Sequence, residues 1–229
     1  MLLSPKNNKN GALFNFATSN RNSYRYKCPC FYLTIGDAEF IKKKEICIQN
    51  VVASAAFNQP VDLEAVVKAF PHVEYRPQLF PGLAFRLKRP RTCTLIFKTG
   101  RMVCTGAKSE GEARRAILKV AKELRAADII TPGKPVIKIQ NIVASGSLSG
   151  PVDLEELCGR AHVGGSIMYE PEQFPGLMYR MKSPKVVFLI FSAGKIVCVG
   201  AKTEDEVYEA VENLRRRLEE MNVIFDEMP

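Results

Sequence analysis

Hydrophobic residues fall into short runs and longer periodic stretches that predict a defined series of elements. Compact apolar runs bounded by turn residues predict β-strands at residues 45–54, 84–88, 92–97 and 101–106. A short helix is predicted to begin at Asp62, whose side chain can cap free backbone N–H groups. A long helix is predicted after Ser109, because Ser109 and Glu112 form a capping box and the following apolar residues recur every 3.6 positions. This order predicts a mostly antiparallel sheet with helices on one side.

The same series of elements occurs twice. Two strings recur at an offset of 91 residues: Ile48–Ser54 as Ile139–Ser145, and Pro60–Glu64 as Pro151–Glu155. After a gain of three residues near Gly164, residues 75–108 match residues 169–202 at 18 of 34 positions, where chance would give about two matches. The chain therefore contains a duplicated unit of about 90 residues, and two such copies side by side predict a pseudo-twofold molecule.

Composition and charge divide the chain into three predicted parts. Residues 1–40 are rich in Asn, Lys, Ser and Tyr without a sustained apolar period, which predicts a flexible N-terminal extension. The first repeat is assigned to residues 41–134 and the second to residues 135–229. Within a net charge of +9, residues 46–135 carry +8 and residues 136–229 carry −4. This polarity suits a protein that holds a nucleic acid and a second protein in a fixed arrangement.

The predicted strands are apolar on both faces, although helices can cover only one face of a sheet. The side chains of Val103 and Met102 are predicted to point to different faces of the sheet. Those of Ile48, Asn50 and Val52 are predicted to share one face. A large apolar face without a helical cover marks a binding surface. Cations from both repeats are predicted to border it and to contact a polyanion: Arg86, Lys88, Arg91, Arg101, Lys108, Arg180, Lys185, Lys195 and Lys202.

An apolar floor with a cationic border fits the DNA minor groove at A·T pairs. That groove presents only the adenine N3 and thymine O2 acceptors, whereas a G·C pair adds a protruding N2 amino group. Asn50 and Asn141 occupy equivalent positions from which they can donate to these acceptors. Each repeat also has two phenylalanines 17 residues apart, the first in a Phe-Pro-Gly-Leu turn: Phe80 with Phe97, and Phe174 with Phe191. Paired aromatic wedges can enter base steps and kink the duplex.

On these residues the chain resembles the TATA-box-binding protein family over about residues 44–224. The matching strings are Ile-Gln-Asn followed by Val or Ile, the segment Tyr169–Leu177, Leu-Ile-Phe, and the Gly-Ala-Lys after each last strand. The resemblance implies an α+β fold of two tandem pseudo-symmetric repeats that form a saddle. It implies a curved ten-stranded antiparallel sheet with four helices on the convex face. The implied function is general transcription initiation: binding and bending of TATA-box promoter DNA.

The resemblance also implies roles for individual residues. Phe80, Phe97, Phe174 and Phe191 match the intercalating phenylalanines of the family. The implied minor-groove contacts are Asn50, Val52, Leu95, Val103, Thr105, Asn141, Val143, Leu189 and Val197. Glu170 and Glu172 fall in the loop that docks the B-type general transcription factor in the family, and recruitment of RNA polymerase would follow. The implied protein acts as a monomer on DNA, and its apolar face leaves open a homodimer when it is free.

Two features separate this chain from a generic member of the family. Val199 stands at the counterpart of Thr105, where the family usually has a hydroxyl group, so Val199 is expected to bias recognition of one half-site. The first loop carries Phe80-Pro81-Gly82, and this symmetry with the second loop favours an archaeal member. An archaeal protein would act in the cytoplasm at the nucleoid, and a eukaryotic one in the nucleus.

Other functions fit the sequence less well. No nucleophile–base pair, phosphate-cradling glycine loop or duplicated metal-ligand set occurs in the sequence, so we expect neither an enzyme nor a cofactor. Cys28-Pro29-Cys30 has no second pair at zinc-site spacing, and no apolar run is long enough to span a membrane. Two alternatives stay open: a TATA-binding-like scaffold for proteins with altered DNA specificity, supported by Val199, and a carrier of an apolar small molecule.

Overall fold

A computed structural model of the protein describes residues 46–131, 133–148, 150–160 and 165–225. The predicted N-terminal extension, including Cys28 and Cys30, lies outside the described residues.

The same order of elements appears in both repeats. The first repeat contains β1 (Cys47–Ala56), α2 (Leu63–Ala69), β2 (Leu83–Leu87), β3 (Thr92–Ile96), β4 (Arg101–Ala107) and α3 (Glu110–Ala126). The second contains β5 (Val136–Ser147), α4 (Leu154–Arg160), β6 (Gly165–Met168), β7 (Leu177–Met181), β8 (Val186–Ile190), β9 (Lys195–Ala201) and α5 (Glu204–Glu220).

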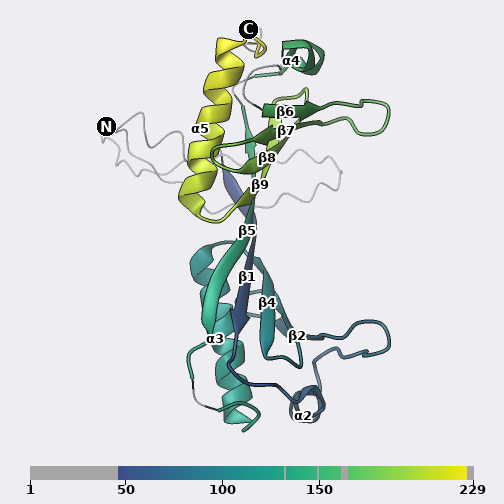
Figure 1. Cartoon of the computed structure of the whole chain (residues 1–229), viewed down its shortest axis with the longest axis vertical. Helices are drawn as coiled ribbons and strands as arrows, with labels where there is room; N and C mark the ends of the chain where they lie inside the picture. The colour runs from purple at the N-terminus through teal and green to yellow at the C-terminus, as the bar shows by residue number, and fades with distance from the viewer. Residues whose placement is uncertain (1–45, 132, 149, 161–164, 226–229) are drawn as a thin grey trace, which may run out of the picture. The chain divides into compact units, whose positions relative to one another are not determined.

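All nine strands join one curved antiparallel sheet, in the order β2-β3-β4-β1-β5-β9-β8-β7-β6. The first strands of the two repeats, β1 and β5, pair at its centre, with Asn50 opposite Val143 and Val52 opposite Asn141. The longest helices, α3 and α5, lie along one face of the sheet, and the loops before β2 and between β6 and β7 project toward the other side (Figure 1). The predicted α+β fold with two repeats is confirmed.

The described part of the sheet has nine strands, one fewer than the ten expected. Where β6 runs beside β7 in the second repeat, the first repeat forms only a single bridge, between Glu74 and Ala84. Pro71 stands at the position of Gly165, the first residue of β6. Proline is tolerated at the first position of an edge strand, and this edge keeps one pair of backbone hydrogen bonds, between Glu74 and Ala84 at 3.1 and 2.9 Å.

The helices begin where their capping residues predict. Asp62 accepts hydrogen bonds from the backbone N–H groups of Glu64 and Ala65 at 2.9 and 3.2 Å. The hydroxyl groups of Ser109 and Thr203 each accept from the N–H three residues later, at 3.1 Å in both cases. Capping satisfies N–H groups that have no partner within the helix. The apolar sides of α3 and α5 then pack on the sheet and bury one of its faces.

The N-termini of α3 and α5 cap each other across the two repeats. The Glu204 carboxylate accepts from the N–H of Glu110 at 3.2 Å, and the Glu110 carboxylate accepts from the N–H of Glu204 at 3.3 Å. Each carboxylate therefore lies beside the positive end of the other helix, which is a favourable position for a negative charge. This reciprocal pair connects the two repeats on the helical side of the sheet.

We expect Glu110→Ala to lower the free energy of unfolding by about 1 kcal/mol, because it removes a cap and a charge at the start of α5. Urea unfolding followed by circular dichroism measures this change. Glu209→Ala is the matched control, because Glu209 is exposed on α5 beyond its first turn. Equal destabilisation by both substitutions would contradict a specific role for the cross-repeat cap.

Candidate nucleic-acid interface

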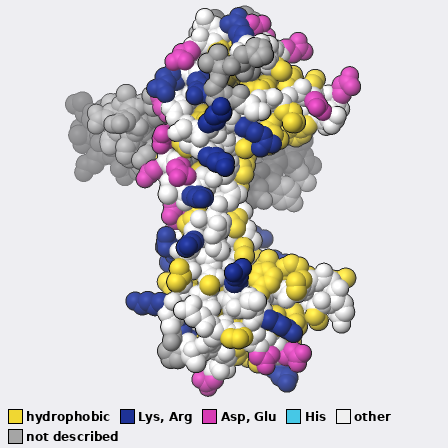
Figure 2. All heavy atoms as spheres, viewed as in Figure 1, with side chains coloured by type: hydrophobic (Ala, Val, Ile, Leu, Met, Phe, Trp, Pro, Cys, Tyr) yellow, Lys and Arg dark blue, Asp and Glu magenta, His cyan; other side chains and the backbone are white. Residues whose placement is uncertain are grey.

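The face of the sheet opposite α3 and α5, here called the open face, carries most of the predicted groove residues. Its aliphatic members are half-buried: Val52, Leu95, Val103, Val143, Leu189, Val197 and Val199. Leu95 pairs with Val103 across the strands, and Leu189 pairs with Val197 in the same way. Figure 2 shows hydrophobic side chains gathered beside the projecting loop of each repeat. The sheet thus presents an apolar surface on the side that no described helix covers.

A β-bulge corrects one of the predicted positions. The pairing of β1 with β5 shifts between Ile48 and Asn50, so Gln49 is an extra residue in β1. An extra residue reverses the alternation of side chains. Ile48 therefore lies opposite Ala144 and packs against the buried core. The prediction that Ile48 shares a face with Asn50 is wrong for this reason.

Two glutamines next to the central asparagines were missed by the sequence analysis. Gln49 Nε2 donates to Ser145 Oγ at 2.7 Å, and Gln140 Nε2 donates to Ser54 Oγ at 2.6 Å. Ser54 and Ser145 lie opposite Val103 and Val197, so both pairs belong to the open face. The repeated string Ile-Gln-Asn was the available signal. These two equivalent bridges add polar groups to the centre of the apolar surface.

The amides of Asn50 and Asn141 have a fixed orientation. The N–H of Gly106 donates to Asn50 Oδ1 at 2.7 Å, and the N–H of Gly200 donates to Asn141 Oδ1 at 2.8 Å. Both glycines have positive φ angles, 95° and 112°, which residues with a Cβ rarely adopt. Because a backbone N–H can only donate, the atom it meets is the amide oxygen. Each Nδ2 group is thereby directed away from the glycine, as a donor.

The surroundings of the two asparagines differ. Asn50 Oδ1 and Nδ2 both lie 3.2 Å from Thr105 Oγ1, with which they can exchange hydrogen bonds. In the second repeat Val199 takes the place of Thr105 and offers no polar atom. The otherwise symmetric centre of the open face is therefore more polar in the first repeat.

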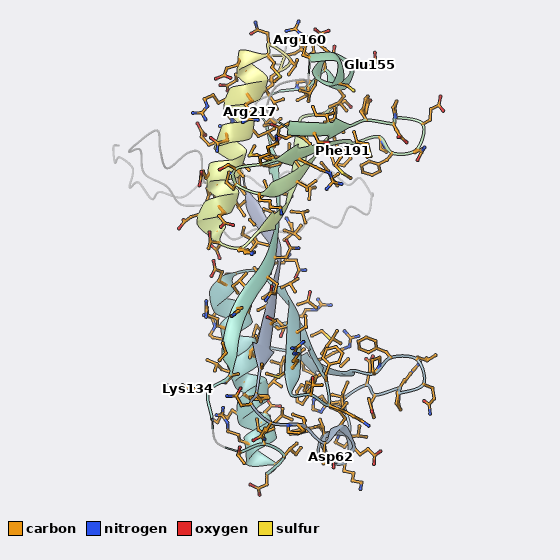
Figure 3. The ribbon with its side chains drawn as sticks, viewed as in Figure 1. Asp62, Lys134, Glu155, Arg160, Phe191 and Arg217 are labelled. Atoms are coloured by element: carbon orange, nitrogen blue, oxygen red, sulfur yellow. The ribbon has the colours of Figure 1, made fainter. Side chains whose placement is uncertain are left out.

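The predicted phenylalanine pairs are assembled in both repeats. The ring centroids of Phe80 and Phe97 lie 5.8 Å apart at an interplanar angle of 67°, and those of Phe174 and Phe191 lie 5.9 Å apart at 65°. Phe80 is 42% exposed and Phe174 44%, so each pair leaves one ring accessible. Figure 3 shows Phe191 on the side of the sheet away from α5. The rings form two equivalent edge-to-face pairs that are not part of the core.

A glycine beneath each pair makes this arrangement possible. A Cβ atom at Gly82 would lie 2.6 Å from the Phe80 ring and 2.9 Å from the Phe97 ring. At Gly176 the corresponding distances to Phe174 and Phe191 are 2.6 and 3.0 Å. Any larger residue would displace the rings. The glycine of the Phe-Pro-Gly string therefore has a steric role as well as a place in the turn.

The predicted cationic border is exposed at all nine positions. Two of its lysines are held by neighbouring groups: Lys108 Nζ donates to the Gln49 carbonyl at 2.7 Å, and Lys195 Nζ donates to Ser147 Oγ at 3.2 Å. In the second repeat Arg180, Lys185 and Lys202 line an open hollow of about 560 Å³. The hollow therefore combines these cations with Val187 and Val199 of the open face.

Arg86 differs from its counterpart Arg180. Arg86 Nε lies 3.0 Å from Glu74 Oε1, and both side chains are 60% exposed. The hydrogen bond and charge of Arg86 hold the pKa of Glu74 below its ordinary value, so this carboxylate is ionised at neutral pH. Met168 occupies the position of Glu74 in the second repeat. Arg86 in the first repeat therefore has a carboxylate partner, whereas Arg180 in the second repeat has a methionine at the corresponding place.

We expect Glu74→Met to tighten DNA binding by up to about fivefold at low salt, because it frees Arg86 from an exposed ion pair that solvent screens. A fluorescence-anisotropy titration with an A·T-rich duplex measures the change. Glu64→Met is the control, since Glu64 is an exposed carboxylate on α2 and its loss changes the net charge equally. If both variants gain the same affinity, the effect belongs to net charge and not to Arg86.

The projecting loops share a backbone conformation but differ in charge. The carbonyl of Glu170 accepts from the N–H groups of Gln173 and Phe174, each at 3.0 Å. The carbonyl of Arg76 accepts in the same way from Leu79 and Phe80. Glu170 and Glu172 are exposed, and acidic side chains are visible at the outer end of the upper loop in Figure 2. The second loop is therefore acidic where the first carries an arginine.

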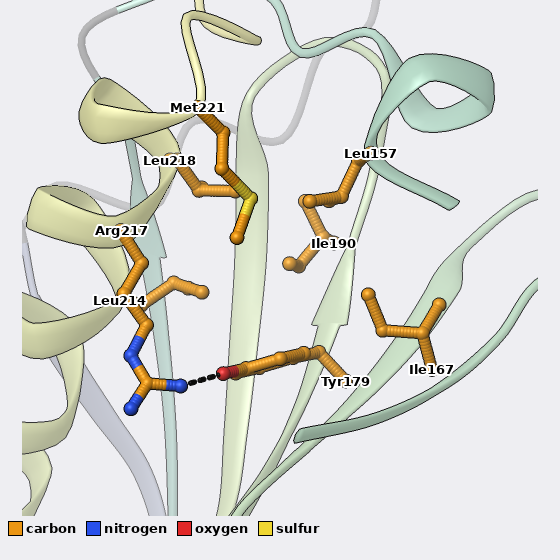
Figure 4. A pocket seen from close by; sticks show the side chains of 8 residues that line it. All are labelled: Leu157, Ile167, Tyr179, Ile190, Leu214, Arg217, Leu218 and Met221. Atoms are coloured by element: carbon orange, nitrogen blue, oxygen red, sulfur yellow. Dashed lines mark hydrogen bonds between the residues drawn. The ribbon is translucent and has the colours of Figure 1, made fainter. Parts of the chain in front are cut away.

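The described residues include a small enclosed cavity beneath α5. Its walls include Leu157, Ile190, Leu214 and Met221, and a hydrogen bond from Arg217 to the Tyr179 hydroxyl lies at its edge (Figure 4). Its free volume is about 10 Å³, whereas small-molecule sites need roughly 300 Å³ or more. This cavity does not support the carrier alternative.

Two cysteines of the sheet are buried on its helical side. Cys104 and Cys198 are buried at equivalent positions in β4 and β9. Burial raises the pKa of the Cys198 thiol to about 12 and also raises that of Cys104. Both thiols are therefore protonated at neutral pH, which suits packing better than redox chemistry.

Two further features of the described residues bear on other functions. They include no group of three or more His, Cys, Asp or Glu side chains that could hold a metal ion. No helix in the part of the chain that the structure describes is long and apolar enough to cross a membrane.

Comparison with known proteins yields consistent matches. The family model described as "Transcription factor TFIID (or TATA-binding protein, TBP)" matches residues 45–127 and 136–221. The TATA-box-binding protein of Pyrobaculum calidifontis is 48% identical over 180 residues, which cover 79% of this chain and 89% of the relative. The protein of the same name from Sulfolobus acidocaldarius is 48% identical over 182 residues, covering 80% and 91%. The solved structure of Methanococcus jannaschii TBP aligns with a TM-score of 0.70 at 44% identity, covering 77% of this chain and 99% of that one.

Proposed function

We propose, from the premise that this chain belongs to the TATA-box-binding protein family, that its open face binds the minor groove of A·T-rich promoter DNA and that its phenylalanine pairs bend the duplex. The family consists of DNA-binding transcription factors and not of enzymes. The observation that carries the proposal is the open face itself: half-buried valines and leucines around two asparagine amides, each oriented by a glycine N–H that donates to its Oδ1. Such a surface suits the minor groove of A·T pairs, whose adenine N3 and thymine O2 atoms can accept hydrogen bonds from the asparagine amides.

The bending mechanism follows from the position of the rings. Phe80 and Phe174 are exposed at the base of the projecting loops, one in each repeat. A ring inserted into a base step partly unstacks it and kinks the duplex, at a cost of a few kcal/mol per step. The cations around the open face, such as Lys185 and Lys202, would follow the phosphates of the bent duplex. The two repeats would thus kink one site at two places.

The same proposal includes protein partners. Glu170 and Glu172 give the second loop an exposed acidic tip, which suits contact with a basic surface of a B-type general transcription factor, followed by RNA polymerase. In this proposal the first repeat spans residues 41–134 and the second spans residues 135–229. The relatives named above are archaeal, so we place its action at the nucleoid. A scaffold without selective DNA binding is the alternative that the next experiment distinguishes.

We expect a TATA duplex to bind much more tightly than a G·C-scrambled duplex of equal length, because each N2 amino group would lie unpaired on the apolar floor. Affinity should also fall steeply with salt, since phosphate contacts release counterions. Anisotropy titrations at several salt concentrations measure both. A duplex with inosine·cytosine pairs in place of G·C is the control, because inosine lacks the amino group. Equal affinity for the TATA and scrambled duplexes would refute the proposal and favour the scaffold.

A further inference from the structure

Two equivalent rows of side chains cross the open face, one in each repeat. The first row, from the centre of the sheet to its edge, is Asn50, Thr105, Cys93 and Arg86; the second row is Asn141, Val199, Val187 and Arg180. Strand pairing links the outer three members of each row, because Thr105 lies opposite Cys93 and Cys93 opposite Arg86. In the same way Val199 lies opposite Val187, and Val187 opposite Arg180. Asn50 joins the first row through its hydrogen bonds with Thr105, and Asn141 joins the second through the N–H of Gly200, the residue after Val199. The rows therefore occupy matching places in the two halves.

The two rows end in the same residue types, asparagine and arginine, and differ in their middles. Each begins with an asparagine that accepts from a glycine N–H and ends with an arginine, Arg86 on the edge strand β2 and Arg180 on β7 beside the edge strand β6. Between them the first row has a hydroxyl and a thiol, whereas the second row has two valines. Burial raises the pKa of the Cys93 thiol, so this group is uncharged at neutral pH. The first row is thus polar along its whole length, and the second is interrupted by aliphatic groups.

The remaining groove residues cannot distinguish the two halves of a bound duplex by polarity. Val52 matches Val143, Leu95 matches Leu189, and Val103 matches Val197. The phenylalanine pairs also match, in residue type and in ring geometry. Ala84 and Met178 differ in size, but both are apolar. Besides the Glu74 partner of Arg86 and the exchange of Ala56 for Ser147 beside Arg101 and Lys195, the two halves differ in hydrogen-bonding groups in the middles of the two rows.

The difference in hydrogen-bonding groups between the two rows affects the binding of a G·C pair. Its N2 amino group is the one donor on the minor-groove side that A·T pairs lack. Thr105 Oγ1 already exchanges hydrogen bonds with Asn50, but a hydroxyl oxygen has two lone pairs and can accept a further donor. Val199 and Val187 have no acceptor, so the same amino group would be desolvated without a partner.

We propose that the polar first row tolerates a G·C pair that the aliphatic second row excludes, so that Thr105 and Cys93, with Val199 and Val187, orient the protein on an asymmetric promoter site. This inference rests on minor-groove binding by the open face. When one half of a site contains G·C, the protein binds in one orientation. In that orientation the G·C-containing half lies under the first repeat. A site with G·C in both halves offers no favourable orientation.

The test uses the full chain and a family of duplexes derived from one symmetric A·T site. A G·C pair is placed in turn at each base pair of one half, or at the symmetric positions of both halves. At the discriminating position, we expect a single G·C pair to lower affinity by less than about threefold, because the protein turns to accept it. G·C in both halves should lower affinity by more than about tenfold. Inosine·cytosine in both halves should restore the affinity of the A·T site.

Variants that exchange the rows make the test specific. C93V/T105V copies the second row into the first repeat, and a single G·C pair should then cost as much as two cost the wild type. V187C/V199T copies the first row into the second repeat, and G·C in both halves should then be tolerated. C158V is the matched control, since Cys158 is exposed on α4. The affinity of each row variant for a G·C-containing site is compared with its own affinity for the A·T site, and C158V should keep the wild-type affinity for both sites and the wild-type unfolding midpoint.

The possible outcomes separate this inference from the proposed function. If the wild type prefers the A·T site but two G·C pairs cost only twice the free energy of one, and exchanging the rows changes nothing, the orientation proposal is overturned while minor-groove binding stands. If the A·T site is not preferred over a scrambled duplex, the proposed function itself fails. A preference that follows the exchanged rows would assign the half-site discrimination to these four residues.

Discussion

Phe174→Ala is expected to reduce the bend of a bound A·T-rich duplex and to weaken binding by about 10- to 100-fold. The ring is 44% exposed in the free protein and would be buried between bases in the complex. Burial of an aromatic side chain contributes about 1.5–3 kcal/mol, and without the wedge the duplex loses the kink that brings its backbone to the cationic border. Phe191→Ala should act in the same direction, because Phe191 supports Phe174 edge-to-face. Fluorescence transfer between dyes at the two ends of the duplex reports the bend.

Two further variants make this expectation specific to the wedge. Leu118→Ala removes an exposed hydrophobic side chain from α3, on the side of the sheet away from the open face, and should leave bending unchanged. Gly176→Ala keeps both rings but introduces a Cβ atom 2.6 Å from the Phe174 ring. It should reduce bending by displacing that ring. A bend angle in Phe174→Ala equal to that of the wild type would rule out the wedge role.

Asn50→Asp and Asn141→Asp are each expected to weaken DNA binding by more than about 100-fold, or about 3 kcal/mol. The substitution preserves the shape of the side chain and the oxygen that accepts from Gly106 or Gly200. It replaces the outward Nδ2 donor by a carboxylate oxygen. Adenine N3 and thymine O2 are acceptors, so the contact changes from a hydrogen bond to a repulsion between acceptors.

The design of these variants separates binding from folding. The retained bond to the glycine N–H predicts an unfolding midpoint close to that of the wild type, measured by thermal circular dichroism. Asp is also an acceptor for Thr105 Oγ1 at Asn50, so the local network of the first repeat persists. Glu172→Gln serves as a control on an exposed loop carboxylate away from the sheet. Unchanged affinity of Asn50→Asp and Asn141→Asp would mean that these amides do not face the bases.

Much of the interface could be predicted from local sequence. The string Ser109-x-x-Glu112 correctly placed the start of α3, because capping depends on residues a few positions apart. Alternation along the strand correctly placed Val103 on the open face and Met102 in the core. Ile48 was misplaced, because the bulge at Gln49 arises from the pairing of β1 with β5 and leaves no signature in the order of apolar residues.

The amino-acid sequence by itself determined the duplication, the order of elements, the phenylalanine pairs with their glycines, and the apolar character of both sheet faces. Only the tertiary structure decided that Asn50 Oδ1 accepts from Gly106, that Glu74 pairs with Arg86, that Glu110 and Glu204 cap each other's helices, and that strand pairing sets Thr105 and Cys93 opposite the places of Val199 and Val187. The physical reason is distance along the chain. Periodicity and capping depend on near neighbours, whereas the deciding hydrogen bonds join residues such as Asn50 with Thr105 and Gln49 with Ser145, which are 55 and 96 positions apart.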